Sequence, residues 1–404
     1  MTNNSIFQYE LLVVMKCLWK LVSLSLTCLC LSAQEPAAVT EVEELSLAGL
    51  QDNERANKSI FSTDRLELAL TYSALIQAAV TEGESAGSGE LHLGGRWVFI
   101  NEDYPSRLME RIGGESDGLL CIKFRIRHRH SLLDIPASQL AGSIGSILGT
   151  TDGFSNSGFE IPDLYVQHIF HDGKVELRYG QLAVESRLDS HAMRSAKKAF
   201  LNRVFSTNPA VPYPRFGAGG IARWQINDYF DLTYALTQVQ ASKTGAQVDF
   251  DLNSNDLFTA IQTGFTWGKK KGTESHIQAM LWAADGTEDA QEDYGFSLGY
   301  EAHFEDSDKS LFLRFANSHG TQSDLNRMGV IGFGKTCRET DLFGLGIGVG
   351  RSSATSDIQG VIETFYRYQA PFQLEITPDI QFLVGNGLRG DYEIVTGLRG
   401  HFNF

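Results

Sequence analysis

The chain has 404 residues, of which 42% are hydrophobic, and it carries a formal net charge of −15. This length suits one large barrel or two globular domains. The hydrophobic fraction is too low for a bundle of membrane-spanning helices, and the acidic charge argues against a nucleic-acid partner. Prolines are few, with 9 in the whole chain, as a continuous sheet requires.

A basic segment that starts near Met15 leads into an apolar run, residues 21–31, and small residues follow up to Ala33. This order is typical of a secretory signal peptide cleaved after Ala33. A membrane anchor is less favoured, because a run of about 11 residues is too short to cross a bilayer. We predict a signal peptide region at residues 1–33, with Met15 as the more natural start, an acidic periplasmic segment at residues 34–65 and a barrel domain at residues 66–404.

From Leu66 onward, apolar and polar residues alternate with the period of a strand. We predict strands in the segments where this alternation is clearest, at residues 66–80, 90–100, 121–130, 174–179 and 230–239. The stretch between the first two, residues 82–89, is rich in Gly and Ser and is predicted as a turn.

Short polar connections at residues 227–228, 268–272 and 305–309 contrast with longer ones at residues 140–158 and 184–220. Short periplasmic turns and longer extracellular loops are typical of outer-membrane barrels. At about 20 residues for each strand and its connection, the barrel domain holds on the order of 16 strands. The predicted fold is an all-β transmembrane antiparallel β-barrel of about 16 strands, with an aqueous lumen.

The last segment alternates with unusual clarity. One parity is mostly apolar and ends in Phe402 and Phe404, whereas the other carries Glu393, Arg399 and His401. Apolar residues toward lipid, polar residues toward a lumen and aromatics at the interface are typical of a transmembrane strand. We expect this strand to face outer-membrane lipid and to be recognised by the barrel-assembly machinery.

The connection at residues 184–220 holds several basic residues and Pro209, Pro212 and Pro214. We predict a short helix around residues 192–204. A long structured loop is usually functional, and our hypothesis is that this one folds into the lumen and narrows it. The alternative, an outside loop that never enters the pore, has equal weight.

Several blocks of the last third resemble the carbohydrate-selective porin family of the OprB type. They are the Glu-x-x-Tyr-Arg block at Glu363, Tyr366 and Arg367, the Pro378-Asp379-Ile380-Gln381 strand, Gly397-Leu398-Arg399 and the final Phe404. Residues 177–182 and 199–203 are similar to the family's central region. The resemblance implies an outer-membrane barrel of about 16 strands in a Gram-negative-type bacterium, which passes sugars passively and uses no cofactor.

A channel for neutral sugars needs hydrogen-bond partners for hydroxyls and apolar surfaces for ring faces. Arginine suits the first need, because its planar fork offers five donors. We predict that one basic row faces the lumen, namely Lys123, Arg125, Arg127 and Arg129. By parity, the further pore-lining candidates are Glu176, Arg178, Glu363, Arg367 and Arg399. His128 and His130 interrupt the opposite face and favour the alternative that the outer part of the row is a solvated strand end.

Other functions remain open at this point. A basic column also attracts anions, so an anion- or phosphate-selective porin or a general porin is the main alternative. An outer-membrane hydrolase is less favoured because no nucleophile-elbow motif is present, and a secreted glycan-binding β-sandwich would need polar outer faces. We predict no catalytic residue, no metal site and no cofactor; the expected partners are small sugars and other small hydrophilic solutes. Cys121 and Cys337 could form a disulfide in an oxidising compartment.

Overall fold

The computed structural model describes residues 60–63, 65–100, 119–171, 173–240, 245–248, 250, 252, 256–268, 272–287 and 290–404. All of them belong to one compact unit, residues 45–404. The predicted signal peptide region lies outside the described residues, as does most of the predicted periplasmic segment.

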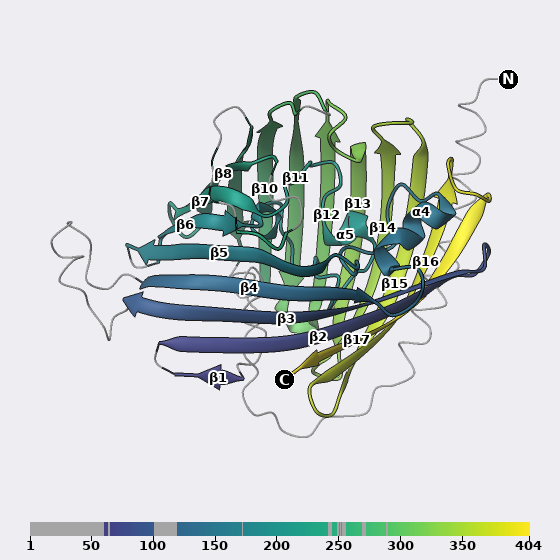
Figure 1. The fold of residues 1–404 in the computed structure, drawn as a ribbon, viewed down its shortest axis with the longest axis horizontal. Coiled ribbons are helices and arrows are strands. Elements are labelled where there is room, and N and C mark those ends of the chain that lie inside the picture. The colour runs from purple at the N-terminus through teal and green to yellow at the C-terminus, as the bar shows by residue number, and fades with distance from the viewer. Residues whose placement is uncertain are drawn as a thin grey trace. The chain divides into compact units, whose positions relative to one another are not determined.

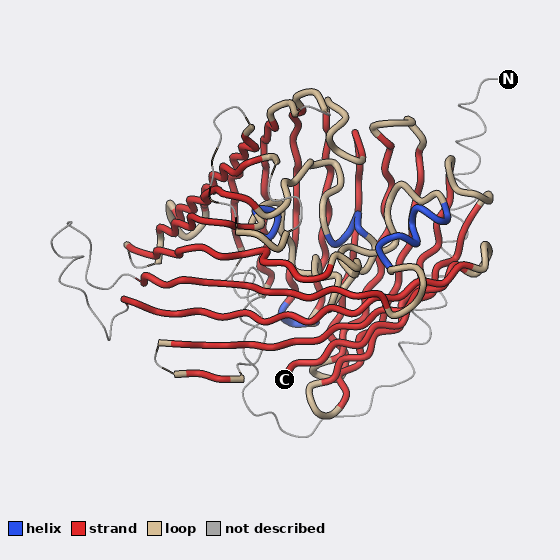
Figure 2. Tube along the Cα trace, viewed as in Figure 1, coloured by secondary structure: helices blue, strands red, loops and turns tan. Residues whose placement is uncertain are grey.

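Antiparallel strands build almost the whole of the described chain (Figures 1 and 2). The strands are β1 (Phe61–Ser62), β2 (Leu66–Ala79), β3 (Glu84–Ile100), β4 (Leu119–Ser131), β5 (Gly158–Phe170), β6 (Val175–Leu182), β7 (Gly217–Gln225), β8 (Phe230–Gln238), β9 (Leu257–Trp267), β10 (Thr273–Ala284), β11 (Asp293–Phe304), β12 (Lys309–Ser318), β13 (Leu325–Cys337), β14 (Asp341–Ser352), β15 (Ile358–Ala370), β16 (Leu374–Gly385) and β17 (Tyr392–Asn403). Short helical turns lie between them: η1 (Ala137–Gln139), α4 (Leu140–Ile144), η2 (Val184–Ser186), α5 (Arg203–Ser206) and η3 (Glu305–Ser307).

The strands close into a barrel. Each strand from β2 onward pairs antiparallel with the next. The last strand, β17, pairs back with β2, with Val395 opposite Ala79. Of the 17 strands in the sheet, β1 has two residues and extends β2, so 16 form the ring. The predicted barrel of about 16 strands is confirmed.

The two ends of the barrel differ in the length of their connections. One end, called here the short-turn end, joins strands through residues 171–174, 226–229, 305–308, 338–340 and 371–373. The opposite, long-loop end carries the longest connections with described residues, 132–157, 183–216 and 239–256. This asymmetry agrees with the sequence prediction. The β3–β4 connection at the short-turn end, residues 101–118, lies outside the described residues.

Two local predictions were wrong. The turn predicted at residues 82–89 is shorter, because β3 begins at Glu84 and pairs with β2 from its first residue, Ala79 to Glu84. Such pairing satisfies backbone groups that a turn would leave to water. The helix predicted around residues 192–204 is confined to α5, where the side chain of Asn202 accepts from the backbone N–H group of Val204.

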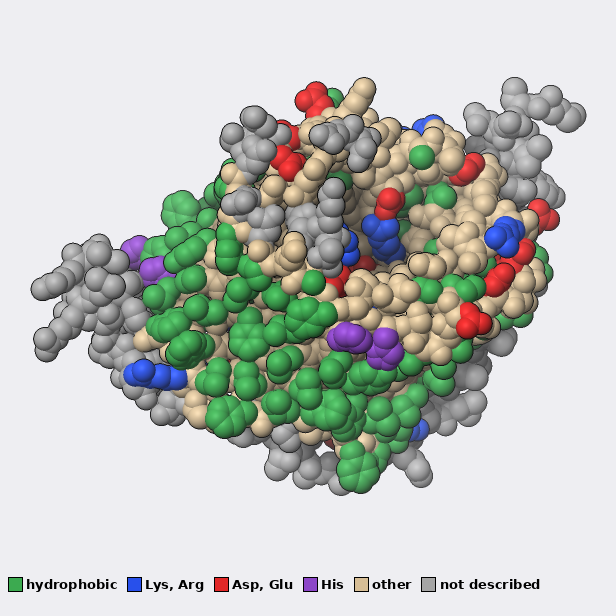
Figure 3. Space-filling model, in the orientation of Figure 1, with side chains coloured by type: hydrophobic (Ala, Val, Ile, Leu, Met, Phe, Trp, Pro, Cys, Tyr) green, Lys and Arg blue, Asp and Glu red, His purple; other side chains and the backbone are tan. Residues whose placement is uncertain are grey.

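Inward and outward side chains alternate along each strand, as predicted for the C-terminal one. On β17, Glu393, Arg399 and His401 are buried inside the barrel, whereas Tyr392 and Leu398 are exposed on the outside. Figure 3 shows one face of the molecule, where hydrophobic side chains cover a broad area and charged side chains gather in the hollow above it. Among the described residues, no helix has both the length and the apolar character needed to cross a membrane.

Part of the barrel interior is packed. Two loops fold inward, the β4–β5 loop (residues 132–157) and the β6–β7 loop (residues 183–216), and bring apolar side chains against the wall. The main contributors are Leu140, Ile144, Leu148, Phe200, Val204 and Phe205 from the loops and Phe312, Val361 and Phe365 from the strands. A barrel of this size therefore does not leave its whole lumen to water; the loops occupy one side of it.

Candidate functional site

Buried polar side chains of the wall hold the β6–β7 loop inside the barrel. The carboxylate of Glu363 on β15 accepts hydrogen bonds from the backbone N–H groups of Leu201 (2.5 Å) and Asn202 (2.9 Å). The guanidinium of Arg399 on β17 donates to the carbonyl oxygens of Ala196 and Ala199, the latter at 2.8 Å. These buried side chains satisfy loop backbone atoms that no helix or sheet satisfies.

Further anchors follow the wall toward β10. Arg314 on β12 forms an ion pair with Asp189 (3.0 Å) and donates to the carbonyl oxygens of Asp189 and Thr207. Glu301 on β11 accepts from the N–H group of Ala192 at 3.0 Å. Gln278 on β10 donates to the carbonyl oxygen of Ser190 at 2.9 Å. The loop thus lies along the inner face of the barrel from β10 to β17.

The β4–β5 loop packs on the β6–β7 loop. Gln77 and Gln381 both donate to the carbonyl oxygen of Thr150, at 3.0 and 2.8 Å. The two loops contact each other through the amide of Asn202, which donates to the carbonyl oxygen of Gly149 at 2.7 Å. The hypothesis that residues 184–220 fold into the lumen therefore agrees with the position of the loop in the structure.

The predicted basic row lies on the inner face of β4, and its arginines pair with carboxylates of the neighbouring strands. Arg125 contacts Asp163 at 2.6 Å, and Arg127 contacts Glu160 at 2.5 Å. Arg129 forms ion pairs with Glu90 and with Glu160. The row therefore presents alternating positive and negative groups to the lumen rather than a purely basic column.

The tip of the β6–β7 loop reaches this charged surface. Lys197 lies 3.0 Å from the carboxylate of Glu90 and 2.5 Å from a ring nitrogen of His92. Burial lowers the pKa of Lys197 to about 8, with Glu90 opposing the shift. Lys197 thus carries a positive charge at neutral pH that mild alkali removes.

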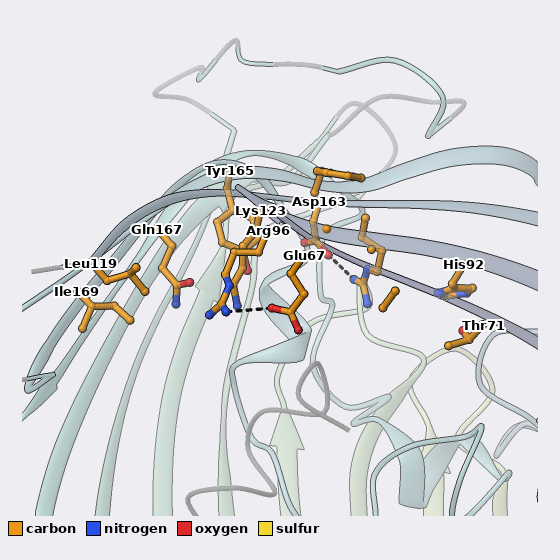
Figure 4. Close-up of a pocket in the computed structure, with 15 residues that line it drawn as sticks. Glu67, Thr71, His92, Arg96, Leu119, Lys123, Asp163, Tyr165, Gln167 and Ile169 are labelled. Atoms are coloured by element: carbon orange, nitrogen blue, oxygen red, sulfur yellow. Dashed lines mark ion pairs between the residues drawn. The ribbon is translucent and has the colours of Figure 1, made fainter. Parts of the chain in front are cut away.

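A cavity of about 240 Å³ lies against the inner faces of β2–β5 (Figure 4). Arg96, Lys123 and Arg125 supply hydrogen-bond donors, and Glu67 and Asp163 supply acceptors. The remaining lining includes the apolar or aromatic side chains of Leu119, Tyr165 and Ile169. Since Lys123 is nearer than Arg129 to the short-turn end of β4, this cavity lies on the short-turn side of the Lys197 contact.

A smaller cavity of about 50 Å³ lies against β6–β10. Glu176, Arg178, Arg187, Arg223 and Asp231 contribute charged groups to its lining. Arg178 forms an ion pair with Glu176 and donates to the hydroxyl of Tyr165 at 3.1 Å. The carboxylate of Glu176 also accepts from the amide of Gln167 at 2.6 Å.

The predicted site residues fall into two groups. The residues that line the cavities or pair on the strands beside them are Lys123, Arg125, Arg127, Arg129, Glu176 and Arg178. The others, Glu363, Arg367 and Arg399, contact the β6–β7 loop; Arg367 donates to the carbonyl oxygen of Lys198 at 3.1 Å. Cys121 and Cys337 are free thiols on β4 and β13, so the disulfide that the sequence allowed does not form.

Sequence reasoning missed the acidic half of the site. Glu90, Glu160 and Asp163 neutralise the arginine row, and Glu90 also holds Lys197. The signal was present on β3, where Glu90 and His92 alternate with Leu91 and Leu93. Their pairing with the arginines depends on the register of β3, β4 and β5, which alternation alone does not give.

Sixteen antiparallel strands around inward-folded loops define a porin-type β-barrel. The high pH structure of Pseudomonas putida OprB has a TM-score of 0.66 at 11% identity, over 84% of this chain and 94% of that chain. A triple mutant of the Rhodopseudomonas blastica porin has a TM-score of 0.52 at 10% identity, over 84% of this chain and 100% of that chain. These likenesses establish the fold.

The sequence of the last third is similar to one particular family. Residues 270–404 match the family described as "Carbohydrate-selective porin, OprB family". The resemblance predicted from the C-terminal motifs is therefore confirmed for this last third of the chain. No curated protein matches the chain.

Proposed function

We propose that the protein passes small solutes passively through the outer membrane of a Gram-negative-type bacterium, with a preference for sugars and without catalysis. The cavity against β2–β5 carries this proposal. Its guanidinium and ammonium groups would donate to sugar hydroxyls, its carboxylates would accept from them, and its apolar lining offers a surface for ring faces. The matching family supports the carbohydrate preference.

The pairing of charges favours neutral solutes over anions. Arg125, Arg127 and Arg129 each have a carboxylate partner. Such pairs present a weaker net field than unopposed arginines, while their remaining donors and acceptors still bind hydroxyl groups.

An anion-preferring or general porin is the second candidate. The cavity wall carries three basic residues, Arg96, Lys123 and Arg125, against two acidic ones, Glu67 and Asp163. This excess predicts a modest preference for anions in salt solutions.

Liposome swelling with a series of neutral sugars tests the proposal. We expect faster swelling with monosaccharides than with larger oligosaccharides. The double variant Arg125→Gln with Asp163→Asn, which removes both charges of one pair without leaving a lone charge, should reduce swelling by sugars. Lys335→Gln, on an outward-facing position of β13, is the matched control.

Equal rates for sugars and for uncharged non-sugar solutes of equal size would argue for a general porin. Strong anion selectivity that sugars do not block would argue against the sugar proposal.

We also propose that residues 1–33 are removed on export and that residues 34–65 form a periplasmic segment before the barrel domain at residues 66–404. Mass spectrometry of the protein purified from outer membranes should find a first residue of Gln34. A mature chain that retains residues 21–31 would contradict this processing.

The C-terminal strand is proposed as the part that the barrel-assembly machinery reads. Phe404 is exposed on the outward side of β17, where an aromatic ring suits the membrane interface. Phe404→Ser should lower the amount of protein recovered in the outer membrane. Phe372→Ser, in the exposed β15–β16 turn, should leave that amount unchanged.

A further inference from the structure

Two arginines lie side by side on the outside of the barrel near its long-loop end. Arg327 on β13 and Arg351 on β14 are direct partners in the strand register. Both are exposed, whereas their neighbours Met328 and Gly350 face inward and are buried. Figure 1 shows β12, β13 and β14 as neighbours in one wall. Like charges directly opposite each other destabilise a strand pair, so this arrangement calls for a compensating group.

The wall itself supplies only a neutral group. Asn317 on β12 is the register partner of Arg327 and accepts from its Nε atom at 3.2 Å. Within the described part of the chain, neither Arg327 nor Arg351 forms an ion pair with a carboxylate. The two guanidinium groups and the amide therefore form one polar row across three strands that faces away from the lumen.

This row lies at the edge of an apolar band. Toward the short-turn end, the next outward positions are Phe315, Gly329 and Val349, followed by Leu313, Ile331 and Ile347. At the other edge of the same strands, Lys309 and Lys335 are register partners. Asn317 lies eight residues after Lys309 on β12, about 26 Å along the strand. Because the strands of such barrels tilt by about 35–45°, this corresponds to roughly 20 Å along the membrane normal. Both basic pairs therefore lie near the two edges of a lipid-facing band about 25 Å tall, within reach of lipid headgroups.

Gly329 leaves a gap in the apolar band beside the two arginines, called here the furrow. Gly329 lies between Phe315 and Val349, both of which project outward. No atom beyond its chain neighbours lies within 4 Å of the position that a Cβ atom at Gly329 would occupy. A glycine between two large outward side chains leaves a gap with apolar walls, directly beside Arg327 and Arg351.

We propose that this surface, the Arg327–Arg351 face, binds an anionic lipid that carries a phosphate in its headgroup. The planar guanidinium groups bind phosphate oxygens with paired hydrogen bonds, and the amide of Asn317 adds a donor. One acyl chain lies in the furrow at Gly329. The site is separate from the pore, because all its residues face outward.

Native mass spectrometry of the full-length barrel in detergent, titrated with phosphatidic acid or phosphatidylcholine of the same acyl chains, tests the proposal. We expect phosphatidic acid to bind more tightly. The double variant Arg327→Gln with Arg351→Gln should weaken its binding about tenfold. The matched control, Lys309→Gln with Lys335→Gln, removes the other outward basic pair and should leave the tightest site unchanged.

A second variant tests the contribution of the furrow to lipid binding independently of the arginine charges. Gly329→Leu keeps both arginines and fills the gap, so it should weaken binding of the long-chain lipid while sparing a short-chain phosphatidic acid. Inorganic phosphate, added in excess, should displace the lipid only weakly, because it lacks the acyl chain.

Three results would overturn the inference: equal affinity for the two lipids, equal losses in the arginine and lysine double variants, or full displacement by inorganic phosphate. Sugar-dependent liposome swelling of the arginine double variant should equal that of the unmodified protein. A swelling defect shared by all variants would count against the proposed sugar channel and not against the lipid site. The experiments therefore distinguish failure of one proposal from failure of the other.

Discussion

At the scale of single residues, the interior of the barrel is organised by buried polar side chains that satisfy loop backbone atoms. Glu363 and Arg399 illustrate the principle: each has almost no exposed surface, and each bonds to main-chain atoms of the β6–β7 loop. Burying a polar or ionisable group costs free energy unless hydrogen bonds replace its water. These two residues therefore position the loop.

The Glu363→Gln variant should release part of the β6–β7 loop. An amide places an N–H group where the carboxylate accepted from Leu201 or Asn202, so one of the two hydrogen bonds is lost. We expect a free energy of unfolding lower by about 1–3 kcal/mol and a noisier, larger single-channel conductance. Glu339→Gln, in the exposed β13–β14 turn, is the control. An unaltered conductance would argue against an anchoring role for Glu363.

Ion selectivity should depend on pH through Lys197. Burial lowers the pKa of this side chain to about 8, so its positive charge is present at pH 7 and lost as the pH rises past 8. The preference for anions, measured as reversal potential in planar bilayers, should therefore fall between pH 7 and pH 9. Lys197→Gln should abolish that step, and a Lys197→Gln channel with the same pH profile would contradict the assignment.

At the scale of elements, the inward loops form a small core of their own. Phe200 lies 4.9 Å from Phe205, 5.7 Å from Phe312 and 5.0 Å from Phe365, measured between ring centroids. The first contact is within the loop and the other two reach β12 and β15. Aromatic packing thus joins the loop to the wall where hydrogen bonds alone would leave apolar surface in water.

Phe200→Ala should therefore destabilise the barrel and widen the channel. Removing a fully buried aromatic ring costs about 3–5 kcal/mol, and the loop loses its main apolar contact with the wall. Thermal unfolding followed by circular dichroism measures the first effect and single-channel conductance the second. Phe372→Ala removes a ring that is 88% exposed and should alter neither; comparable losses in both variants would refute the packing argument.

At the scale of the whole molecule, closure by the β17–β2 pair decides which side of every strand meets lipid. Leu398 lies in the middle of β17 and is 56% exposed, whereas its neighbour Arg399 is fully buried. Position 398 suits an apolar side chain and position 399 a polar one, although the two are adjacent in sequence. The reason is that adjacent residues of a strand point to opposite faces.

Leu398→Arg places a charge on the lipid-facing side and should lower the free energy of unfolding in liposomes by about 2–4 kcal/mol. Denaturant unfolding monitored by tryptophan fluorescence measures this change. Leu398→Ala separates the loss of the leucine from the gain of the charge and should cost less. Equal losses for the two variants would argue against a lipid-facing position.

The sequence by itself determined the barrel class, the approximate number of strands and the inward or outward sense of the clearest strands. The reason is local: alternation with period 2 is set by side chains within one strand, and the C-terminal motifs are continuous in sequence. The basic row on β4 was visible for the same reason.

Only the tertiary structure decided what the inward residues do. Arg127 and Glu160 are 33 positions apart, and the loop contacts of Glu363 join residues 161 and 162 positions apart. The gap beside Arg327 depends on the register of three strands. The failed helix prediction at residues 192–204 has the same origin, because the wall satisfies that backbone from a distance. Register and loop packing are set by long-range contacts, which a local pattern does not contain.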